Sequence, residues 1–452
     1  MAFSSLVFVF LFLPITLIIN RTLLNRNMLR NIVLLALSLL FYAWGDLKNL
    51  PIFILSVLFN YFAGKAISAF NHENRETEKR VMMIVAAGTD ILMLVLFKYT
   101  SLVMPLGVSF YTFSALSYIF DVYYGRVNED ENVLTVCLYI LFFPKVISGP
   151  IMQYKDFASQ VENPSISKSR FFAGAHLFMM GLFKKMLLAD NLGNAFNSIH
   201  ELNQMAGLTA WLEMILYALQ LYFDFSGYSD MAIGLANMLG FKMSKNFNYP
   251  YMSDGVIDFW RRWHISLGAW FRDYVYIPIG GNRCSREKQI RNLAIVWIIT
   301  GIWHGNTWNF VIWGIWHGIF VILEKFVIKE KRNVLPRPVR IILTNFVVFV
   351  GWIMFFSPTL KDALHFVAEM FGADGLGFIN SGTMYELLQN LILIVAALVF
   401  AGPLPMKIEN RFIAKGGQAQ RIIATAIYII LFIFCIANMV GTTYSSFLYF
   451  RF

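Results

Sequence analysis

The chain has 452 residues, of which 58% are hydrophobic and 14% charged, and its mean hydropathy is +0.59. A soluble protein carries about 25% charged residues, so this composition excludes an ordinary soluble domain. The net charge of +10 does not indicate nucleic-acid binding, because the basic residues lie between apolar blocks and act as topology signals. The blocks are roughly 15 to 22 residues long, which predicts an all-α polytopic protein embedded in the lipid bilayer.

The N-terminal third alternates apolar runs with basic links. The first run lacks a positive n-region before it, so we expect an uncleaved helix with the N-terminus outside. The basic link 21–30 and the charged loop 65–80 then lie on the cytoplasmic side. Predicted spans cover 31–44, 51–64, 81–97 and 105–121. Segment 133–155 contains Pro144, Lys145, Gly149 and Pro150, which predicts a kinked or re-entrant element.

The rest of the chain continues this alternation. Further spans are predicted at 170–189, 207–241, 293–304, 308–328, 341–356, 386–402 and 422–440. Segment 242–292 is dense in lysine and arginine, so we expect a cytoplasmic or interfacial layer with amphipathic helices. The same alternation places the C-terminus outside.

Two carboxylates, Asp224 and Asp230, lie in the apolar run 207–241. One interpretation is that they cap or break a helix at the interface. The other is that they pair with the basic layer downstream. The sequence leaves both open.

The stretch 258–318 holds three of the seven histidines and eight of the eleven tryptophans. Ionisable groups at membrane depth are costly, which makes them candidates for function. His304 suits general-base chemistry, although a buried histidine that bonds across helices is the simpler alternative. The polar residues Asn306, Thr307 and Asn309 close by favour an active site. His317 follows by 13 residues, about 220° around a helix, so we expect it to be structural.

His264 follows two arginines, and it either anchors an interfacial helix or positions a substrate. Arg261, Arg262 and Arg272 either set topology or hold the phosphates of a nucleotide-bearing donor. No GxSxG, Walker or zinc-ligand pattern occurs, and the three cysteines have no metal-type spacing, so no metal is expected. A solute transporter is the rival from another class, but the paired broken helices of an inverted repeat are missing.

Five stretches resemble the membrane-bound O-acyltransferase (MBOAT) family. They are PLGVSFYTFSALSYIFD (105–121), FFPKVISGPI (142–151), DFSGYSDMAIGLANMLGF (224–241), NFNYPYMSDGVIDFWRRWHISLGAWFRDYVYIPIGGNR (246–283) and GIWHGNTWNFVIWGIWHG (301–318). Within the family the chain is similar to the bacterial branch of alginate and peptidoglycan O-acetyltransferase membrane subunits. Teichoic acid D-alanyltransferase is a more distant relative.

The resemblance implies a ring of about 11–13 transmembrane and re-entrant helices around a thin central funnel. It makes 1–452 one membrane domain, with N-terminal helices 1–121, a catalytic core 122–328 and C-terminal helices 329–452. His304 matches the catalytic histidine of the family, and His264 matches the second histidine of its active site. The implied donor is acetyl-CoA, held by Arg261, Arg262, Arg272 and Trp303. Asn306 is expected to orient groups or to stabilise the oxyanion.

The terminal sequence FLYFRF resembles an acyl-accepting tail in which Tyr449 carries the acyl group onward. An aromatic belt at the membrane interface is the alternative interpretation. The resemblance further implies a bacterial inner-membrane location, an esterase-like partner protein outside the membrane and a polysaccharide acceptor. Alginate, cellulose, peptidoglycan and other exopolysaccharides all remain open as that acceptor. D-Alanyl transfer to a teichoic-acid-like polymer is the alternative chemistry.

Overall fold

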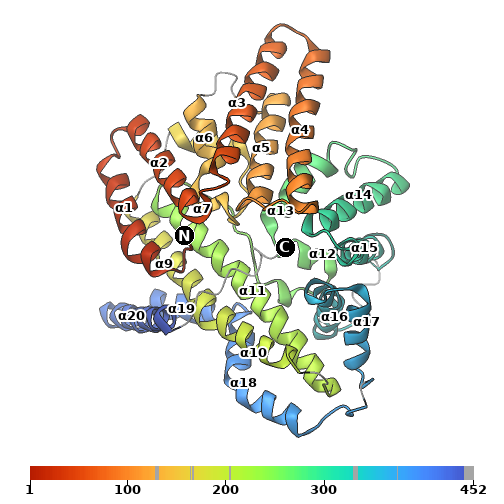
Figure 1. Ribbon diagram of the computed structural model, residues 1–452. Coiled ribbons are helices and arrows are strands. Elements are labelled where there is room, and N and C mark those ends of the chain that lie inside the picture. Colours follow the sequence, from red (N-terminus) through yellow and green to blue (C-terminus); the bar gives the residue numbers. More distant parts are fainter. Residues whose placement is uncertain are drawn as a thin grey trace. The chain divides into compact units, whose positions relative to one another are not determined.

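The computed structural model describes residues 1–127, 132–162, 164, 167–202, 205–328, 334–373 and 375–441. These residues form helices and connecting turns, and none of them forms a strand (Figure 1). Eight of the helical segments are long and apolar enough to cross a membrane, and a shorter apolar helix covers Phe8–Thr22. The eight are Asn27–Asp46, Leu50–His72, Glu76–Tyr99, Lys168–His200, Trp308–Ile328, Arg337–Phe356, Ser381–Phe400 and Gln418–Gly441. The predicted polytopic all-α membrane fold is therefore confirmed.

The chain divides into two compact units. The first comprises Met1–Met180 and Tyr228–Lys245, and the second comprises Gly181–Gly227 and Asn246–Phe452.

In the first unit, the long helices α3 (Leu50–His72), α4 (Glu76–Tyr99) and α5 (Val108–Tyr123) pack side by side (Figure 1). Gly107 precedes α5 with φ +70°, and a Cβ atom there would lie 2.5 Å from the carbonyl oxygen of Val146. A left-handed backbone at such a close approach requires glycine. The turn at Gly107 therefore sets the position of the start of α5 against residue Val146 of the broken element that follows.

That broken element is the predicted kink of segment 133–155. It consists of α6 (Val133–Leu141), the short α7 (Phe143–Val146), an extended stretch and α8 (Tyr154–Glu162). Pro144 lies in the first turn of α7, where its missing N–H costs nothing. The prediction of an interrupted helix is confirmed.

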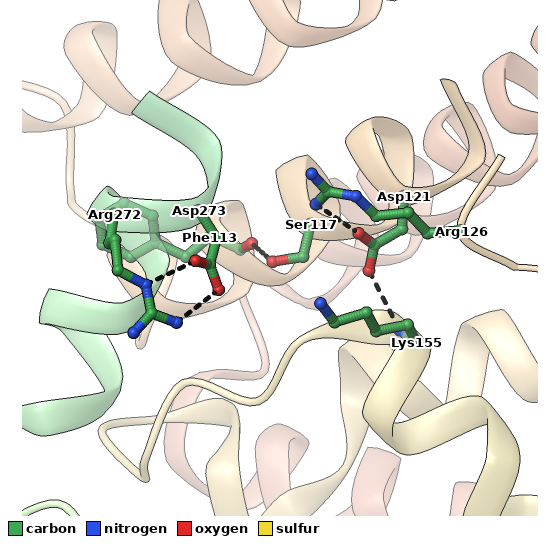
Figure 2. Close-up of polar contacts among 7 residues, drawn as sticks. All are labelled: Phe113, Ser117, Asp121, Arg126, Lys155, Arg272 and Asp273. Atoms are coloured by element: carbon green, nitrogen blue, oxygen red, sulfur yellow. Dashed lines mark hydrogen bonds and ion pairs between the residues drawn. The ribbon is translucent and has the colours of Figure 1, made fainter. Parts of the chain in front are cut away.

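Two charged side chains hold this region of the first unit together. Lys145 is 3% exposed, and its Nζ donates to Ser114 Oγ at 2.7 Å and lies 3.8 Å from the centre of the Tyr139 ring. Asp121 accepts from the backbone N–H of Lys155 at 3.1 Å and pairs with Arg126 at 3.3 Å (Figure 2). The carboxylate thus ties the end of α5 to the first turn of α8.

In the second unit, α14 (Arg286–His304) and α15 (Trp308–Leu323) form an antiparallel hairpin joined at 305–307 (Figure 1). A Cβ atom on Gly301 would lie 2.5 Å from the carbonyl oxygen of Phe310, and one on Gly314 would lie 2.4 Å from that of Trp297. Glycine at these positions lets the two backbones touch. The helix α16 (Arg337–Phe356) then packs antiparallel beside α15.

A buried ion triad lies elsewhere in the second unit. Lys185, on the π-helix η2 (Lys184–Ala189), places its Nζ 2.8 Å from a carboxylate oxygen of Asp190 and 2.8 Å from one of Asp224. Asp190 begins α10 (Asp190–His200), and Asp224 lies on α11 (Gly207–Met238). In this contact the partner of Asp224 is Lys185, which precedes it in the sequence, and not a residue of the basic layer 242–292.

Candidate active site

Two of the predicted histidines, His264 and His304, line one cavity of the second unit. Its volume is about 230 Å³, and we call it the histidine cavity. Its remaining walls are formed by Trp260, Trp263, Leu267, Gly268, Phe271, Arg272, Tyr276, Leu293, Val296, Trp297 and Thr300. Two imidazoles in an aromatic cavity provide proton-accepting nitrogens where water is scarce.

One face of α14 forms a continuous wall of the histidine cavity. The lining residues on this helix are Leu293, Val296, Trp297, Thr300 and His304. Their spacing of three or four residues puts them on one side of a helix. From Leu293 to His304 the helix rises about 16 Å.

The ring of His264 is held by Asn246. His264 has φ +46° and immediately precedes α13 (Ile265–Phe271). Asn246 Oδ1 accepts from the backbone N–H of Ser266 at 3.2 Å, so this atom is an acceptor. It lies 3.2 Å from His264 Nδ1, which must therefore carry the proton. The neutral ring then keeps its lone pair on Nε2.

Burial sets the charge state of His264. The side chain is 3% exposed, and its ring stands edge-on to Phe225 with 4.7 Å between the ring centres. Loss of hydration lowers the pKa of His264 to about 3. The imidazole is therefore neutral at physiological pH, as an acceptor nitrogen requires.

His304 is the last residue of α14 and is 6% exposed. Aromatic rings surround it: the ring centres of Trp303, Trp313 and Phe355 lie 4.6, 4.8 and 5.2 Å from that of His304. The chain continues through Gly305 with an extended backbone, φ −167°. His304 thus stands at the end of a helix, with its side chain in a mostly apolar setting.

His317 lies on α15 and is absent from the cavity wall. Its ring centre is 4.8 Å from that of Trp260 and 5.1 Å from that of Trp313. Neither ring nitrogen has a hydrogen-bond partner among the described residues. A Cβ atom on Gly351 would lie 2.3 Å from His317 Nε2, so α16 closes over the ring.

A second, larger cavity of about 420 Å³ adjoins the first, and we call it the charged cavity. It is lined by Ile257, Asp258, Arg261, Tyr276, Asn282, Leu293, Val321, Glu324 and Lys325. Tyr276 and Leu293 belong to both cavities. These two side chains therefore form part of the wall of both spaces.

Hydrogen bonds organise one side of the charged cavity. Asn282 Oδ1 accepts from Tyr276 Oη at 2.8 Å and from Lys325 Nζ at 2.7 Å. On the other side, Glu324 accepts from the backbone N–H of Ile257 at 3.0 Å, near the start of α12 (Val256–Trp260). These contacts leave Arg261 as a cation in the wall with no ion pair to a described residue.

The three predicted donor-binding arginines differ in their surroundings. Arg261 lines the charged cavity, and Arg262 pairs with Asp258 at 3.0 Å. Arg272 lines the histidine cavity and forms two hydrogen bonds to Asp273, at 2.7 and 3.1 Å (Figure 2). That carboxylate raises the pKa of Arg272, which keeps the guanidinium charged. Arg272 begins the π-helix η4 (Arg272–Tyr276), which also carries Tyr276 to the cavity wall.

Other predicted site residues lie outside both cavities. Asn306 is exposed in the 305–307 link, and Trp303 packs against His304 without lining either cavity. Tyr449 lies outside the described residues. No group of three or more His, Cys, Asp or Glu side chains that could hold a metal occurs in the described part of the chain.

The residues that sequence reasoning missed are Asn246, Tyr276 and Leu293. Asn246 precedes His264 by 18 residues, and the turn that unites them depends on a left-handed backbone at His264. Of these three, only Leu293 could have been predicted from the sequence. It lies four residues before Trp297 and eleven before His304, which puts it on the same face of the helix.

Comparison with known proteins finds a matching family model and several similar proteins. The model of the MBOAT, membrane-bound O-acyltransferase family matches residues 128–361. The chain is 34% identical over 489 residues to "Probable alginate O-acetylase AlgI" of Pseudomonas putida, covering all of both chains. It is 30% identical to the "Peptidoglycan O-acetyltransferase" of Helicobacter pylori, over 89% of this chain and 86% of that one. It is also 30% identical to the "Teichoic acid D-alanyltransferase" of Bacillus subtilis, over 50% and 60%.

Proposed function

Because this chain belongs to the membrane-bound O-acyltransferase (MBOAT) family and is an acyltransferase, we propose that it moves an acetyl group from cytoplasmic acetyl-CoA toward a polysaccharide outside a bacterial inner membrane. One observation carries this proposal. Both histidines line one cavity, and two of its other lining residues, Tyr276 and Leu293, also line the charged cavity. The charged cavity suits the charged end of such a donor, and the histidine cavity suits its long, thin arm.

The charged end of the donor is assigned to the charged cavity. Arg261 and Lys325 supply positive charge there, and guanidinium groups bind phosphate well. The arm of the donor then passes Tyr276 and follows α14 toward His304. Its acetyl thioester reaches the part of the cavity that both histidines line.

The chemical step is transfer of the acetyl group from sulfur to oxygen. His304 takes the proton of the acceptor hydroxyl as that oxygen attacks the thioester carbonyl. The C–S bond breaks, a C–O ester bond forms, and the departing thiolate receives the proton. His264, neutral and fixed by Asn246, helps to orient the reacting groups.

The acceptor is either a polymer hydroxyl or Tyr449, which then passes the acetyl group to a partner protein of esterase type. Alginate- and peptidoglycan-modifying relatives support a polysaccharide as the final acceptor. The half-length match to a teichoic acid D-alanyltransferase keeps D-alanyl transfer as the alternative chemistry.

Replacement of His304 by Asn tests the proposal. The full-length variant in membranes should lose acetyl transfer from labelled acetyl-CoA while its amount in the membrane is unchanged. His365→Gln is the matched control, because that imidazole is 63% exposed on α17 (Leu360–Glu369). Normal acetylation by the His304→Asn protein would overturn the assignment of the base.

A further inference from the structure

The histidine cavity is long but small. Its wall on α14 extends about 16 Å from Leu293 to His304. Its volume of about 230 Å³ lies below the roughly 300–1,000 Å³ of pockets that take drug-sized ligands. A carrier arm that follows α14 to His304 would therefore leave little room for the group it carries.

Trp260 closes one wall of this cavity and is backed by other rings. The ring centres of Trp297, Trp313 and His317 lie 4.9, 5.6 and 4.8 Å from that of Trp260. Trp313 is 1% exposed, and His317 is fully buried. The indole of Trp260 has no free space behind it, so a longer acyl chain could not displace it without disrupting this packing.

Gly268 contributes to the cavity wall from α13. A Cβ atom built on Gly268 meets no atom within 4 Å. Side-chain atoms added there would enter open space and would not clash with the protein. Because Gly268 lines the cavity, a larger side chain there is expected to narrow it, and a smaller one at Trp260 is expected to widen it.

We infer that Trp260 sets the size of the acyl group that the histidine cavity accepts, so that a two-carbon group fits beside His264 and His304 and longer chains are rejected. This inference rests on the proposed function, because it assumes that an acyl thioester reaches these histidines. Trp260 acts as a specificity-determining residue and takes no part in proton transfer.

The wall at Trp260 leads to an expected preference among acyl-CoA donors of different chain length. One methylene group that fits or fails to fit an apolar pocket changes kcat/KM by about 10- to 200-fold. The unaltered protein should therefore prefer acetyl-CoA over propionyl-CoA by at least about tenfold, and butyryl-CoA should be poorer still.

The test compares full-length protein in proteoliposomes with acetyl-, propionyl- and butyryl-CoA, and it measures thiol release and acylated product. Trp260→Leu should raise the kcat/KM ratio of butyryl- to acetyl-CoA by about tenfold or more. Trp44→Leu is the matched control, because that indole is 61% exposed on α2 (Asn27–Asp46) and lines neither cavity. An unchanged ratio in a folded, active Trp260→Leu protein overturns the inference.

Gly268→Val tests the same idea in the opposite direction and decides the matter if Trp260→Leu does not fold. It should lower the ratio of propionyl- to acetyl-CoA, and a ratio equal to that of the unaltered protein overturns the inference. Failure of the proposed function looks different. In that case the unaltered protein consumes no acyl-CoA of any length.

Discussion

Asn246 Oδ1 lies 3.2 Å from His264 Nδ1 and also accepts hydrogen bonds from the backbone N–H and the hydroxyl of Ser266. One amide oxygen thus fixes the tautomer of the imidazole and anchors the start of α13. His304, the other histidine of the cavity, ends α14, and the rings of Trp313 and Phe355 pack against it.

If His264 positions the reacting groups, replacing Asn246 by Ala should lower acyl transfer by about 10- to 100-fold, by analogy with the loss of a group that orients a metal-binding histidine. The free ring could adopt the other tautomer, which would put its proton on Nε2. Initial rates with a labelled thioester measure this loss. Asn390→Ala is the control, because Asn390 bonds only its own helix in the described contacts. Equal rates in both variants would contradict a positioning role.

The lowered pKa of His264 predicts how stability depends on acid. The folded value of about 3 lies below the ordinary value of 6.5, so protons bind the unfolded chain first. The contribution to stability is full above pH 6.5 and is lost as the pH falls toward 3. His264→Gln should flatten this part of the curve. Melting temperatures of both proteins in detergent, measured from about pH 4 to about pH 8, check this expectation. Parallel curves for the two proteins would contradict it.

Loss of the Asp224 carboxylate should destabilise the second unit. Asp224→Ala removes one of the two carboxylates that pair with the buried ammonium of Lys185. Because Asp190 remains, the cost should be smaller than the about 3–5 kcal/mol of leaving a buried charge without a partner. Thermal unfolding followed by size-exclusion chromatography measures this change. Glu78→Ala, which breaks an exposed pair with Arg75, should have little effect. Similar melting curves for both variants would show that the triad is not needed for stability.

If the charged cavity holds the donor phosphates, Arg261→Gln should raise the KM for the acyl-CoA donor by about tenfold, because it would remove a charged hydrogen bond to phosphate. The value of kcat should change little. Arg262→Gln should have the smaller effect on KM, because Asp258 already engages that guanidinium. Donor titrations at two salt concentrations separate the two variants. Equal KM values for both would place the phosphates elsewhere.

Tyr449→Phe separates an acyl relay from an aromatic anchor, because it keeps the ring and removes only the hydroxyl. If Tyr449 carries the acetyl group, polymer acetylation is abolished and no acetylated C-terminal peptide is found by mass spectrometry. Tyr385→Phe, at an exposed tyrosine of α18 (Ser381–Phe400), is the control. Full acetylation by the Tyr449→Phe protein would leave the aromatic anchor as the role of this residue.

The eight segments that are long and apolar enough to cross a membrane were predictable from length and hydropathy. The other predicted spans, 105–121, 207–241 and 293–304, fall on α5, α11 and α14, which are not among these eight. Pro144 similarly predicted the break between α6 and α8. His317 was expected to be structural and to share no helix face with His304; it does lie outside the histidine cavity, and its role stays a prediction. The expectation assumed one straight helix, whereas the link 305–307 puts the two residues on separate helices, and packing under Gly351 removes His317 from the cavity.

Contacts between residues far apart in the sequence were not predictable in the same way. Lys185 and Asp224 meet although 39 positions separate them (224 − 185), and no local periodicity relates them. Asn306 was expected to act beside His304, but the turn after α14 leaves it exposed. The arrangement of one membrane domain with both termini outside stays a prediction, as do the roles assigned to the site residues.

Tyr276 belongs to the walls of both cavities, and its hydroxyl is bonded to Asn282 in the charged cavity. A molecule that turns this ring from one side also changes the shape of the space on the other side. A ligand that turns this ring in one cavity would link its own binding to that of a ligand in the other cavity, and any such linkage is reciprocal. If the proposed donor sites hold, a nucleotide fragment without an acyl arm and a small acyl mimic would then change each other's affinity by the same factor.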